Sequence, residues 1–292
     1  MKIGLLDVDS KIPNLALMKI SQWHKSKGDD VEFYMPLARH LYDKVYASKI
    51  FNFSDGSDIQ PEMIVGGTGI DLKISLPSGV DEMLPDYSIY NYPHNIGFAM
   101  RGCRFACKFC VVPEKEGRPK SADTISDLWT QRSSDFLVLL DNDFFGNPEW
   151  SDRIAEIKKL GLKVNFNQGL NIRLISDRQA EALASVNFRN LSGTHKEVYF
   201  AWDQIKDEKV IIRGINRVIK AGLKPYQMQF YILVGFDSTP EEDMHRVLML
   251  RDLGCRPYVM PYDKKDRYQR RFTRWVNHKG VFNSCSFEDY TG

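Results

Sequence analysis

Short apolar runs alternate with amphipathic segments along most of this chain. The runs begin near Phe136, Val164, Val198, Met228 and Tyr258. Successive starts lie about 30 residues apart, which is the length of one strand followed by one helix. A further strand over residues 97–101 and a helix over residues 125–132 complete a series of six such units.

The segments between these runs carry helix boundary signals. Ser176-Asp-Arg-Gln179 and Thr239-Pro-Glu-Glu242 each have the form of a capping box, in which two side chains satisfy free N–H groups of the first turn. Pro240 suits the first position of a helix, and Gly161 and Gly222 suit the position just after one. Strands that alternate with helices in this way predict a parallel sheet with right-handed crossovers.

Six units are too few for the usual closed barrel of eight strands. For residues 93–263 we therefore predict an α/β fold, a partial (β/α)6 TIM-like barrel whose open side would admit a large substrate. A flat, doubly wound sheet is the alternative. Residues 1–92 are interpreted as a small Rossmann-like α/β domain, and residues 264–292 as a basic and aromatic C-terminal extension. The strands of the first domain are predicted at residues 3–6, 31–34, 45–51 and 63–65.

Composition limits the class of protein further. Of the 292 residues, 43% are apolar and 27% are charged, which is the usual mixture of a globular chain. The formal net charge is only +2, so a polyanionic partner would have to be met by a local basic patch. The longest apolar runs fall far short of the roughly 20 residues of a membrane span, and no secretory signal follows Met1. We expect a cytoplasmic protein without a membrane partner.

The positions of the cysteines indicate a metal-binding or redox site. Three of the five lie within eight residues, at Cys103, Cys107 and Cys110, and such a cluster indicates metal ligation or redox chemistry in a reducing compartment. They follow the first strand of the repeat, where a barrel carries its functional loops. Three thiolates on one loop select zinc or an iron–sulfur cluster. Structural zinc needs a fourth ligand, such as His94, whereas a cubane cluster held by three cysteines keeps one iron open.

The C-x3-C-x2-C spacing, with Phe109 just before the last cysteine, resembles the radical S-adenosylmethionine (SAM) superfamily, in its form with a single 4Fe–4S cluster. The resemblance covers residues 97–262. Within the superfamily, Cys110-Val-Val-Pro113 is similar to the branch of tRNA methylthiotransferases and cobalamin-binding radical enzymes.

The resemblance implies that Cys103, Cys107 and Cys110 are the catalytic cluster ligands and that the open iron binds SAM. It also implies an external electron donor, flavodoxin-like or ferredoxin-like. One electron would break the C5′–S bond of SAM, and the resulting 5′-deoxyadenosyl radical would abstract hydrogen from a substrate. The protein's part is to tune the cluster and hold SAM in position.

The resemblance also implies SAM contacts at the ends of the strands. Asn142 or Asp143 takes the place of the polar group that meets the SAM amino group, and Arg213 is a candidate for its carboxylate or ribose. Helix capping, exposed turns, a solvated arginine and core packing are the alternative roles for these positions. The implied cofactor-binding residues are Phe109, Asn142, Asp143, Asn167, Gln168, Asp203, Arg213, Leu233, Gly235, Met260 and Tyr262.

Other motifs of that branch are missing. No cysteine precedes residue 103, so the three N-terminal cysteines that hold the second cluster of methylthiotransferases are absent. Asp7-Val-Asp-Ser-Lys-Ile12 lacks the histidine and glycine of a cobalamin loop, so we do not expect cobalamin, and a vestigial or substrate-capping first domain is favoured. Cys255 and Cys285 are interpreted as small buried hydrophobes.

Two further segments have more than one interpretation. Gly66-Gly-Thr-Gly69 is interpreted as a plain turn rather than a phosphate loop, because residues 70–76 suggest a strand and not a helix. The segment 264–279 holds seven Lys or Arg residues and one Asp, with Tyr268, Phe272 and Trp275 at helical spacing. It is either a grip on a phosphate-bearing substrate with rings that stack, or an amphipathic helix that packs its rings on the barrel.

The sequence leaves the substrate unknown. A radical SAM methyltransferase and a non-catalytic iron–sulfur or zinc-binding module stay open as alternatives to a hydrogen-abstracting enzyme.

Overall fold

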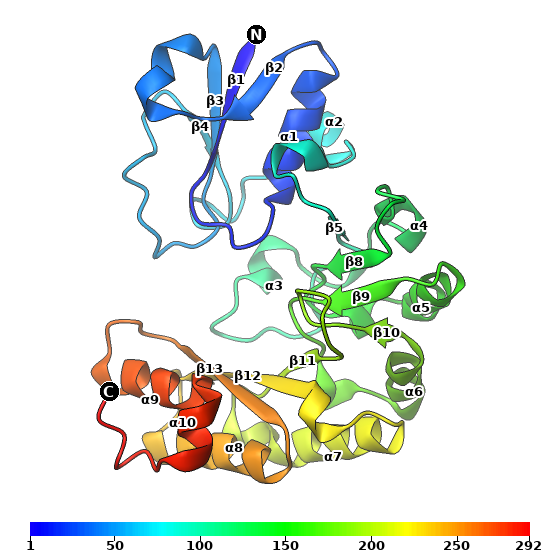
Figure 1. The fold of residues 1–292 in the computed structure, drawn as a ribbon, viewed down its shortest axis with the longest axis vertical. Helices are drawn as coiled ribbons and strands as arrows, with labels where there is room; N and C mark the ends of the chain where they lie inside the picture. Colours follow the sequence, from blue (N-terminus) through cyan, green and yellow to red (C-terminus); the bar gives the residue numbers. More distant parts are fainter. The chain divides into compact units, whose positions relative to one another are not determined.

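The computed structural model describes all 292 residues and divides into two compact units. Unit 1 is Met1–His94 and unit 2 is Asn95–Gly292. Each unit combines helices with parallel strands (Figure 1), which confirms the predicted α/β class. No helix has both the length and the apolar character that a membrane crossing requires.

Unit 1 is built on one four-stranded parallel sheet in the order β2-β1-β3-β4. The chain changes direction along the sheet after β2, as in a doubly wound fold. A small core of Ile3, Leu5, Leu17, Ile20 and Val31 joins this sheet to the first helix. The elements are β1 Lys2–Asp7, α1 Leu15–Lys25, β2 Asp30–Phe33, η1 Pro36–Leu41, β3 Lys44–Ser48, β4 Ile64–Gly66, α2 Ser78–Asp81 and η2 Tyr87–Ile89.

The segment after β4 corrects one prediction and confirms another. No helix begins at Gly66–Gly69, so the predicted turn is confirmed. The strand predicted over residues 70–76 is wrong, because the N–H groups of Ile70 and Asp71 both donate to the Gly67 carbonyl and fold the chain into turns. The Asp71 carboxylate then accepts from the Lys73 N–H at 2.8 Å, which continues the turn.

Unit 2 contains two parallel sheets, in the orders β10-β9-β8-β5 and β11-β12-β13, and one antiparallel pair, β6-β7. A single parallel bridge between Leu170 and Phe200 links the two parallel sheets. Apart from the two-residue β10, strand order follows chain order. The strands are β5 Asn95–Gly97, β6 Met100–Arg101, β7 Lys120–Ser121, β8 Phe136–Leu139, β9 Lys163–Phe166, β10 Asn187–Phe188, β11 Val198–Ala201, β12 Met228–Val234 and β13 Arg256–Pro261.

The helices of unit 2 follow the strands. Both predicted capping boxes are present, at Ser176 and Thr239. The helix predicted to reach residue 132 ends at Leu128, since Trp129 leaves helical geometry and its indole N–H donates to the Ser134 carbonyl at 2.8 Å. The elements are α3 Val112–Lys115, α4 Ile125–Leu128, η3 Phe144–Gly146, α5 Trp150–Lys159, η4 Ile172–Leu174, α6 Asp177–Ser185, η5 Ile205–Asp207, α7 Glu208–Lys220, η6 Pro225–Gln227, α8 Pro240–Asp252, α9 Arg267–Asn277 and α10 Lys279–Ser284.

The strand predicted over residues 97–101 is split in two. β5 ends at Gly97 and β6 begins at Met100. At this break the N–H groups of Ala99 and Met100 donate to the buried Asp141 carboxylate, at 2.8 and 3.0 Å, instead of to a neighbouring strand. A side chain from the end of β8 therefore redirects the chain toward the cysteines.

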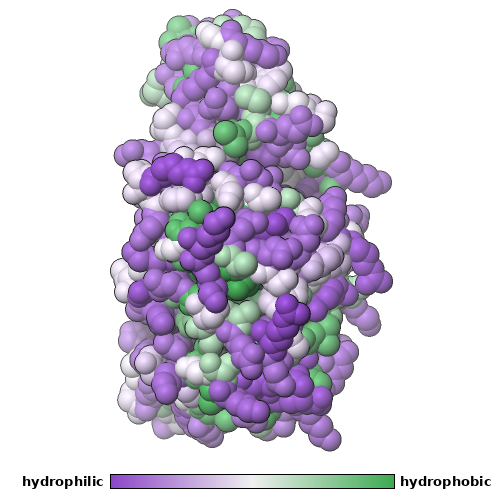
Figure 2. All heavy atoms as spheres, turned by 90° about the vertical axis from the view of Figure 1, so that its right-hand side faces the viewer, coloured by the Kyte–Doolittle hydropathy of each residue, from purple (hydrophilic) through white to green (hydrophobic).

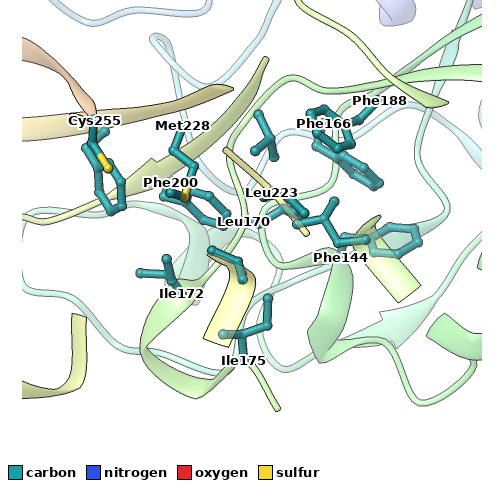
Figure 3. Close-up of a cluster of buried hydrophobic side chains, with 14 of the residues drawn as sticks. Phe144, Phe166, Leu170, Ile172, Ile175, Phe188, Phe200, Leu223, Met228 and Cys255 are labelled. Atoms are coloured by element: carbon teal, nitrogen blue, oxygen red, sulfur yellow. The ribbon is translucent and has the colours of Figure 1, made fainter. Parts of the chain in front are cut away.

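One large hydrophobic cluster fills the space between the sheets and helices of unit 2 (Figure 3). Phe144, Phe166, Phe200 and Met228 are among its fully or nearly fully buried members. Cys255 is part of this cluster, and burial raises the pKa of its thiol to about 12, so its predicted role as a small buried hydrophobe is confirmed. The same prediction is wrong for Cys285, which is only half-buried and whose thiol donates to the Ser286 carbonyl. Figure 2, which faces α4 to α7, shows a mainly hydrophilic outer surface with small hydrophobic patches.

The outer edge of β13 is closed to further pairing. In a parallel ladder the backbone groups of alternate residues face alternate sides, and Tyr262 donates to Val234 of β12, so residues 257, 259 and 261 face outward. Pro257 and Pro261 have no N–H to offer. The Asn277 side chain of α9 bonds both the N–H and the carbonyl of Val259, at 2.7 and 2.9 Å. A helix therefore covers the edge where another strand would add.

The rings of the C-terminal segment are part of the core. Phe272 and Trp275 of α9 are buried, and Tyr268 stacks on Phe272 with ring centres 5.4 Å apart. The suggestion that these three rings stack on a ligand is therefore wrong, since they are needed to attach α9 to the sheet. The structure bears out the alternative, an amphipathic helix packed on unit 2.

Candidate functional site

The three clustered cysteines lie on one irregular loop between β6 and α3. The pairing of Arg101 with Lys120 closes the base of this thiol loop, which we define as residues 102–119. Gly102 is required there, because it has a φ of +83° and a Cβ would overlap with the Arg118 carbonyl. In Figure 1, α3 lies on the side of unit 2 toward which β8 and β9 point, opposite α4, α5 and α6.

The three thiols are free and half-buried. Burial raises the pKa of Cys103 and of Cys110, and the charges of the neighbouring thiols act in the same direction. The Phe105 N–H points at the Cys103 sulfur from 3.5 Å, and the Val112 N–H lowers the pKa of Cys110 by hydrogen bonding. These thiols are close enough to influence one another electrostatically.

Three thiols on one loop are a donor set for a soft metal centre. Soft thiol ligands on one loop select zinc or iron–sulfur centres, and N–H groups directed at the sulfurs are one of the means by which proteins tune such clusters. No group of three or more His, Cys, Asp or Glu side chains is arranged to hold a metal ion in the structure. His94, considered as a fourth zinc ligand, is the last residue of unit 1.

Side chains of the thiol loop anchor it to the ends of three strands. Arg104 pairs with the fully buried Asp143 after β8, with Nε–Oδ2 and Nη2–Oδ1 distances of 2.6 and 2.9 Å. The ring of Phe105 lies 3.9 Å from the guanidinium carbon of Arg173, beyond β9. Phe109 meets the ring of Phe236, just after β12, with 5.5 Å between centres.

Glu116 fixes the base of the thiol loop. Its carboxylate accepts from Arg101 Nη2 and from the Gly102 N–H, each at 2.8 Å. It also accepts from Asn142 Nδ2 at 3.0 Å. One carboxylate therefore holds the loop against the turn after β8 that carries the predicted SAM contacts.

A small polar cavity of about 80 Å³ opens beside the thiol loop, at the carboxyl ends of β8, β9 and β11. Small-molecule sites have volumes of about 300–1,000 Å³, so this cavity could enclose only part of a ligand. Three of the predicted residues line it: Asn142, Gln168 and Asp203. The full lining is Asn142, Gln168, Gly169, Leu170, Asn171, Arg173, Ala201, Asp203 and Asp207.

Charges of both signs face this cavity. Arg173 pairs with Asp207 at 3.0 Å. Burial raises the pKa of Asp203, while the Leu233 N–H, 3.2 Å away, and the charges of Arg246 and Arg173 oppose the rise. The Asp203 charge also raises the pKa of Cys110, so cavity and thiols are within electrostatic reach. Such a lining suits a zwitterionic ligand, with an ammonium group for the carboxylates and a carboxylate for the arginine.

Of the eight predicted contacts that do not line the cavity, three lie after β8, after β9 and on α7. Asp143 is fully buried and both of its oxygens are engaged by Arg104. Asn167 is half-buried, and its N–H donates to the Leu139 carbonyl. Arg213 is exposed on α7. The structure brings none of them to the cavity wall.

The predicted residues of β12 and β13 form a second group. Leu233 reaches the cavity only through its N–H bond to Asp203. Gly235 has a φ of +78°, and the Gln269 side chain fills the space that a Cβ would take. Met260 and Tyr262 are exposed at the end of β13. The Tyr262 ring contacts Phe236 with 4.9 Å between centres, which connects this group to Phe109 of the thiol loop.

Sequence reasoning missed several site residues. Asn171, Arg173 and Asp207 lie several residues beyond the ends of their strands, whereas the sequence pattern singles out only the first polar residues after a strand. Arg104 lies between two of the cysteines and carried no recognised signal. The signal that was available is general, because the loops after parallel strands carry the ligand contacts in such folds.

No protein-family model matches this sequence. A search of curated proteins gives no match either.

Proposed function

We propose that this chain is a radical SAM enzyme and that unit 2 is a partial (β/α)6 barrel. The strand order supports the barrel, because β5, β8, β9, β11, β12 and β13 follow one another without the reversal of a doubly wound sheet. β5 and β13 are each paired on one side only, so the sheet stays open.

The observation that carries the proposal is the position of the three free thiols. Cys103, Cys107 and Cys110 lie on a loop that is anchored to the carboxyl ends of parallel strands, beside a polar cavity. They would hold a 4Fe–4S cluster. When bound, such a cluster supplies one electron to SAM, which divides into methionine and a 5′-deoxyadenosyl radical.

The chain's own groups would bind and orient SAM. Arg173 offers a guanidinium for the carboxylate of its methionine part, and Asp203 offers a carboxylate for the amino group. Asn142 and Gln168 add amide groups at the same wall. Arg104 and Glu116 would keep the thiol loop fixed during turnover, because both are tied to the turn after β8.

The test is anaerobic reconstitution with iron and sulfide, followed by SAM and dithionite. We expect bound iron and sulfide, and 5′-deoxyadenosine detected by mass spectrometry. Cys103→Ser, Cys107→Ser and Cys110→Ser should each lose both the iron and the product. Cys285→Ser is the matched control, since Cys285 is also a half-buried free thiol of unit 2, and it should keep both.

Two results would overturn the proposal. One is wild-type protein that takes up zinc, no iron, and forms no 5′-deoxyadenosine. The other is a cysteine variant of the thiol loop that retains full iron content and activity. Formation of S-adenosylhomocysteine instead of 5′-deoxyadenosine would indicate a methyltransferase.

A further inference from the structure

Three arginines of α9 form a basic stripe that the fold does not use. Arg267, Arg270 and Arg274 are all exposed and, at a spacing of three and four residues, lie on one side of the helix. None of their guanidinium groups takes part in an ion pair or hydrogen bond in the structure. Arg271 differs, because it donates to the carbonyls of Phe287 and Tyr290 and so fixes the C-terminal segment.

The acidic residues beside the stripe are occupied with the backbone. Asp266 caps α9 by accepting from the Gln269 N–H at 2.8 Å, and Asp263 accepts from the Lys265 N–H at 2.8 Å. Residues 264–279 contain seven Lys or Arg and one Asp. This edge of unit 2 is therefore strongly positive, although the whole chain carries only +2.

Exposed aromatic and thioether side chains lie on β13, the strand whose edge α9 covers. Tyr258, Met260 and Tyr262 alternate along β13 and so project from one face of the sheet. They are 42%, 37% and 56% exposed, respectively. Tyr231 of β12 supports this row, with its ring centre 5.9 Å from that of Tyr258. Unlike the buried rings of α9, these rings are free to stack on a ligand.

The aromatic row and the basic stripe are carried by two neighbouring elements of unit 2, β13 and α9. Asn277 at the end of α9 bonds Val259 in the middle of β13, and only four residues separate Tyr262 from Arg267. Tyr262 is also joined to the thiol loop through its ring contact with Phe236, which in turn contacts Phe109. A ligand that stacks on Tyr262 would therefore lie close to the thiol loop.

We propose that the substrate of this site is a single-stranded nucleic acid. Its phosphates would pair with Arg267, Arg270 and Arg274, and its bases would stack on Tyr258 and Tyr262. The three arginines span about 10 Å of helix, which is enough to meet at least two phosphates of one strand. The inference rests on the proposed function for the chemistry that follows, but binding itself requires only this surface.

The test measures binding by fluorescence anisotropy with the anaerobically reconstituted full chain. The probes are mixed-sequence single-stranded RNA, single-stranded DNA of the same sequence, and the DNA duplex, each over a range of salt concentrations. We expect binding to the single strands that weakens with salt and is stronger than binding to the duplex. The RNA and DNA arms identify the sugar that the surface prefers.

Two sets of variants separate the charge from the stacking. R267Q/R270Q/R274Q should lower single-strand affinity at least about tenfold and reduce the salt slope by about 2. Y258A/Y262A should lower affinity about tenfold through lost stacking, with the salt slope unchanged. The control is K158Q/K159Q/K220Q, which removes three positive charges from exposed positions on α5 and α7 and should leave affinity within about twofold.

Wild-type affinity in the arginine variant would overturn the inference, as would equal loss in the lysine control. Unchanged affinity in the tyrosine variant would overturn the nucleic-acid assignment and leave a surface for any polyanion. The two proposals fail separately. A protein that forms 5′-deoxyadenosine but binds no nucleic acid contradicts only this inference. One that binds nucleic acid through α9 but forms no 5′-deoxyadenosine contradicts only the proposed function.

Discussion

Polar residues follow the strands of both units, but the two units use them differently. In unit 1 their hydrogen bonds are used within the fold. Asn14 caps α1 through the N–H groups of Ala16 and Leu17, and its amide donates to Ser10 and Ser48. The Asp9 carboxylate is likewise occupied, by the N–H groups of residues 50 and 51, and Asp7 accepts from Tyr90.

In unit 2 the corresponding edge is left open. Gln168, Arg173 and Asp203 surround a cavity instead of filling it, and three free thiols lie beside them. A polar residue at the end of a parallel strand therefore indicates a binding site only when part of its hydrogen-bonding capacity is left unused by the fold. This difference depends on side-chain geometry, and it can be tested by removing one group at a time.

The largest effect is expected at the ion pair that anchors the thiol loop. Arg104→Met leaves the Asp143 carboxylate buried without its partner, and breaking a buried pair costs about 3–5 kcal/mol. We expect a loss of this order in the free energy of unfolding, measured by urea denaturation, together with loss of iron. Tyr90→Phe is the comparison in unit 1. Its partner Asp7 is only half-buried, so removal of one hydrogen bond should cost about 1 kcal/mol. Equal losses in the two variants would contradict the contrast between the units.

The next largest effect is expected in the pH dependence of stability, through Asp141. Burial raises the pKa of Asp141 to about 7, although the N–H groups of Met100 and Ala99 oppose the rise, and one carboxylate oxygen has no partner. The folded state then holds this proton more tightly than the unfolded state, so the contribution to stability is full below about pH 4 and is lost as pH rises through 7. Each unit of pKa corresponds to about 1.4 kcal/mol.

Comparison of wild type with Asp141→Asn isolates this contribution. The variant keeps an acceptor for both N–H groups but has no proton to lose. Its free energy of unfolding should therefore rise relative to that of wild type by about 2–4 kcal/mol between pH 4 and pH 8. Parallel pH profiles of the two proteins would show that Asp141 does not titrate in this range.

Features that depend on neighbouring residues could be predicted from the sequence better than features that depend on residues far along the chain. The capping boxes at Ser176 and Thr239 and the burial of Cys255 were predictable, because periodicity and neighbouring residues determine them. The strand predicted at residues 70–76 failed, since Asp71 favours a turn that apolar content alone does not reveal.

The site was predicted only in part for a similar reason. The spacing of the cysteines is visible in the sequence, and so are the polar residues that end each strand. Whether such a residue lines the cavity depends on partners far along the chain. Asp143 turns away because Arg104 engages it, 39 positions earlier, and Arg173 reaches the cavity because it lies opposite Phe105. The sequence around each of these residues does not indicate which distant residue it will pair with.

A smaller effect is expected for the cap of α1. Asn14→Ala removes an N-cap and two side-chain hydrogen bonds, one buried and one partly buried, and loss of such a cap costs about 1–2 kcal/mol. The free energy of unfolding should fall by this amount, while the yield of 5′-deoxyadenosine per bound iron stays at the wild-type value. A variant that unfolds normally but forms no product would instead place a functional site at the edge of unit 1.

The smallest effect on stability is expected for Gln168→Ala. This side chain is exposed at the cavity wall and makes no hydrogen bond in the structure, so the free energy of unfolding should change by less than about 0.5 kcal/mol. Loss of one hydrogen bond to a ligand is worth about 0.5–1.5 kcal/mol, so the concentration of SAM needed for half-maximal 5′-deoxyadenosine formation should rise roughly two- to tenfold. Gln60→Ala, a change of the same side chain in unit 1, is the control and should leave that concentration unchanged. Asn14→Ala should lower stability without affecting product formation, whereas Gln168→Ala should weaken SAM binding without affecting stability. A loss of stability in Gln168→Ala, with no change in the SAM concentration required, would mean that the cavity wall is a structural network.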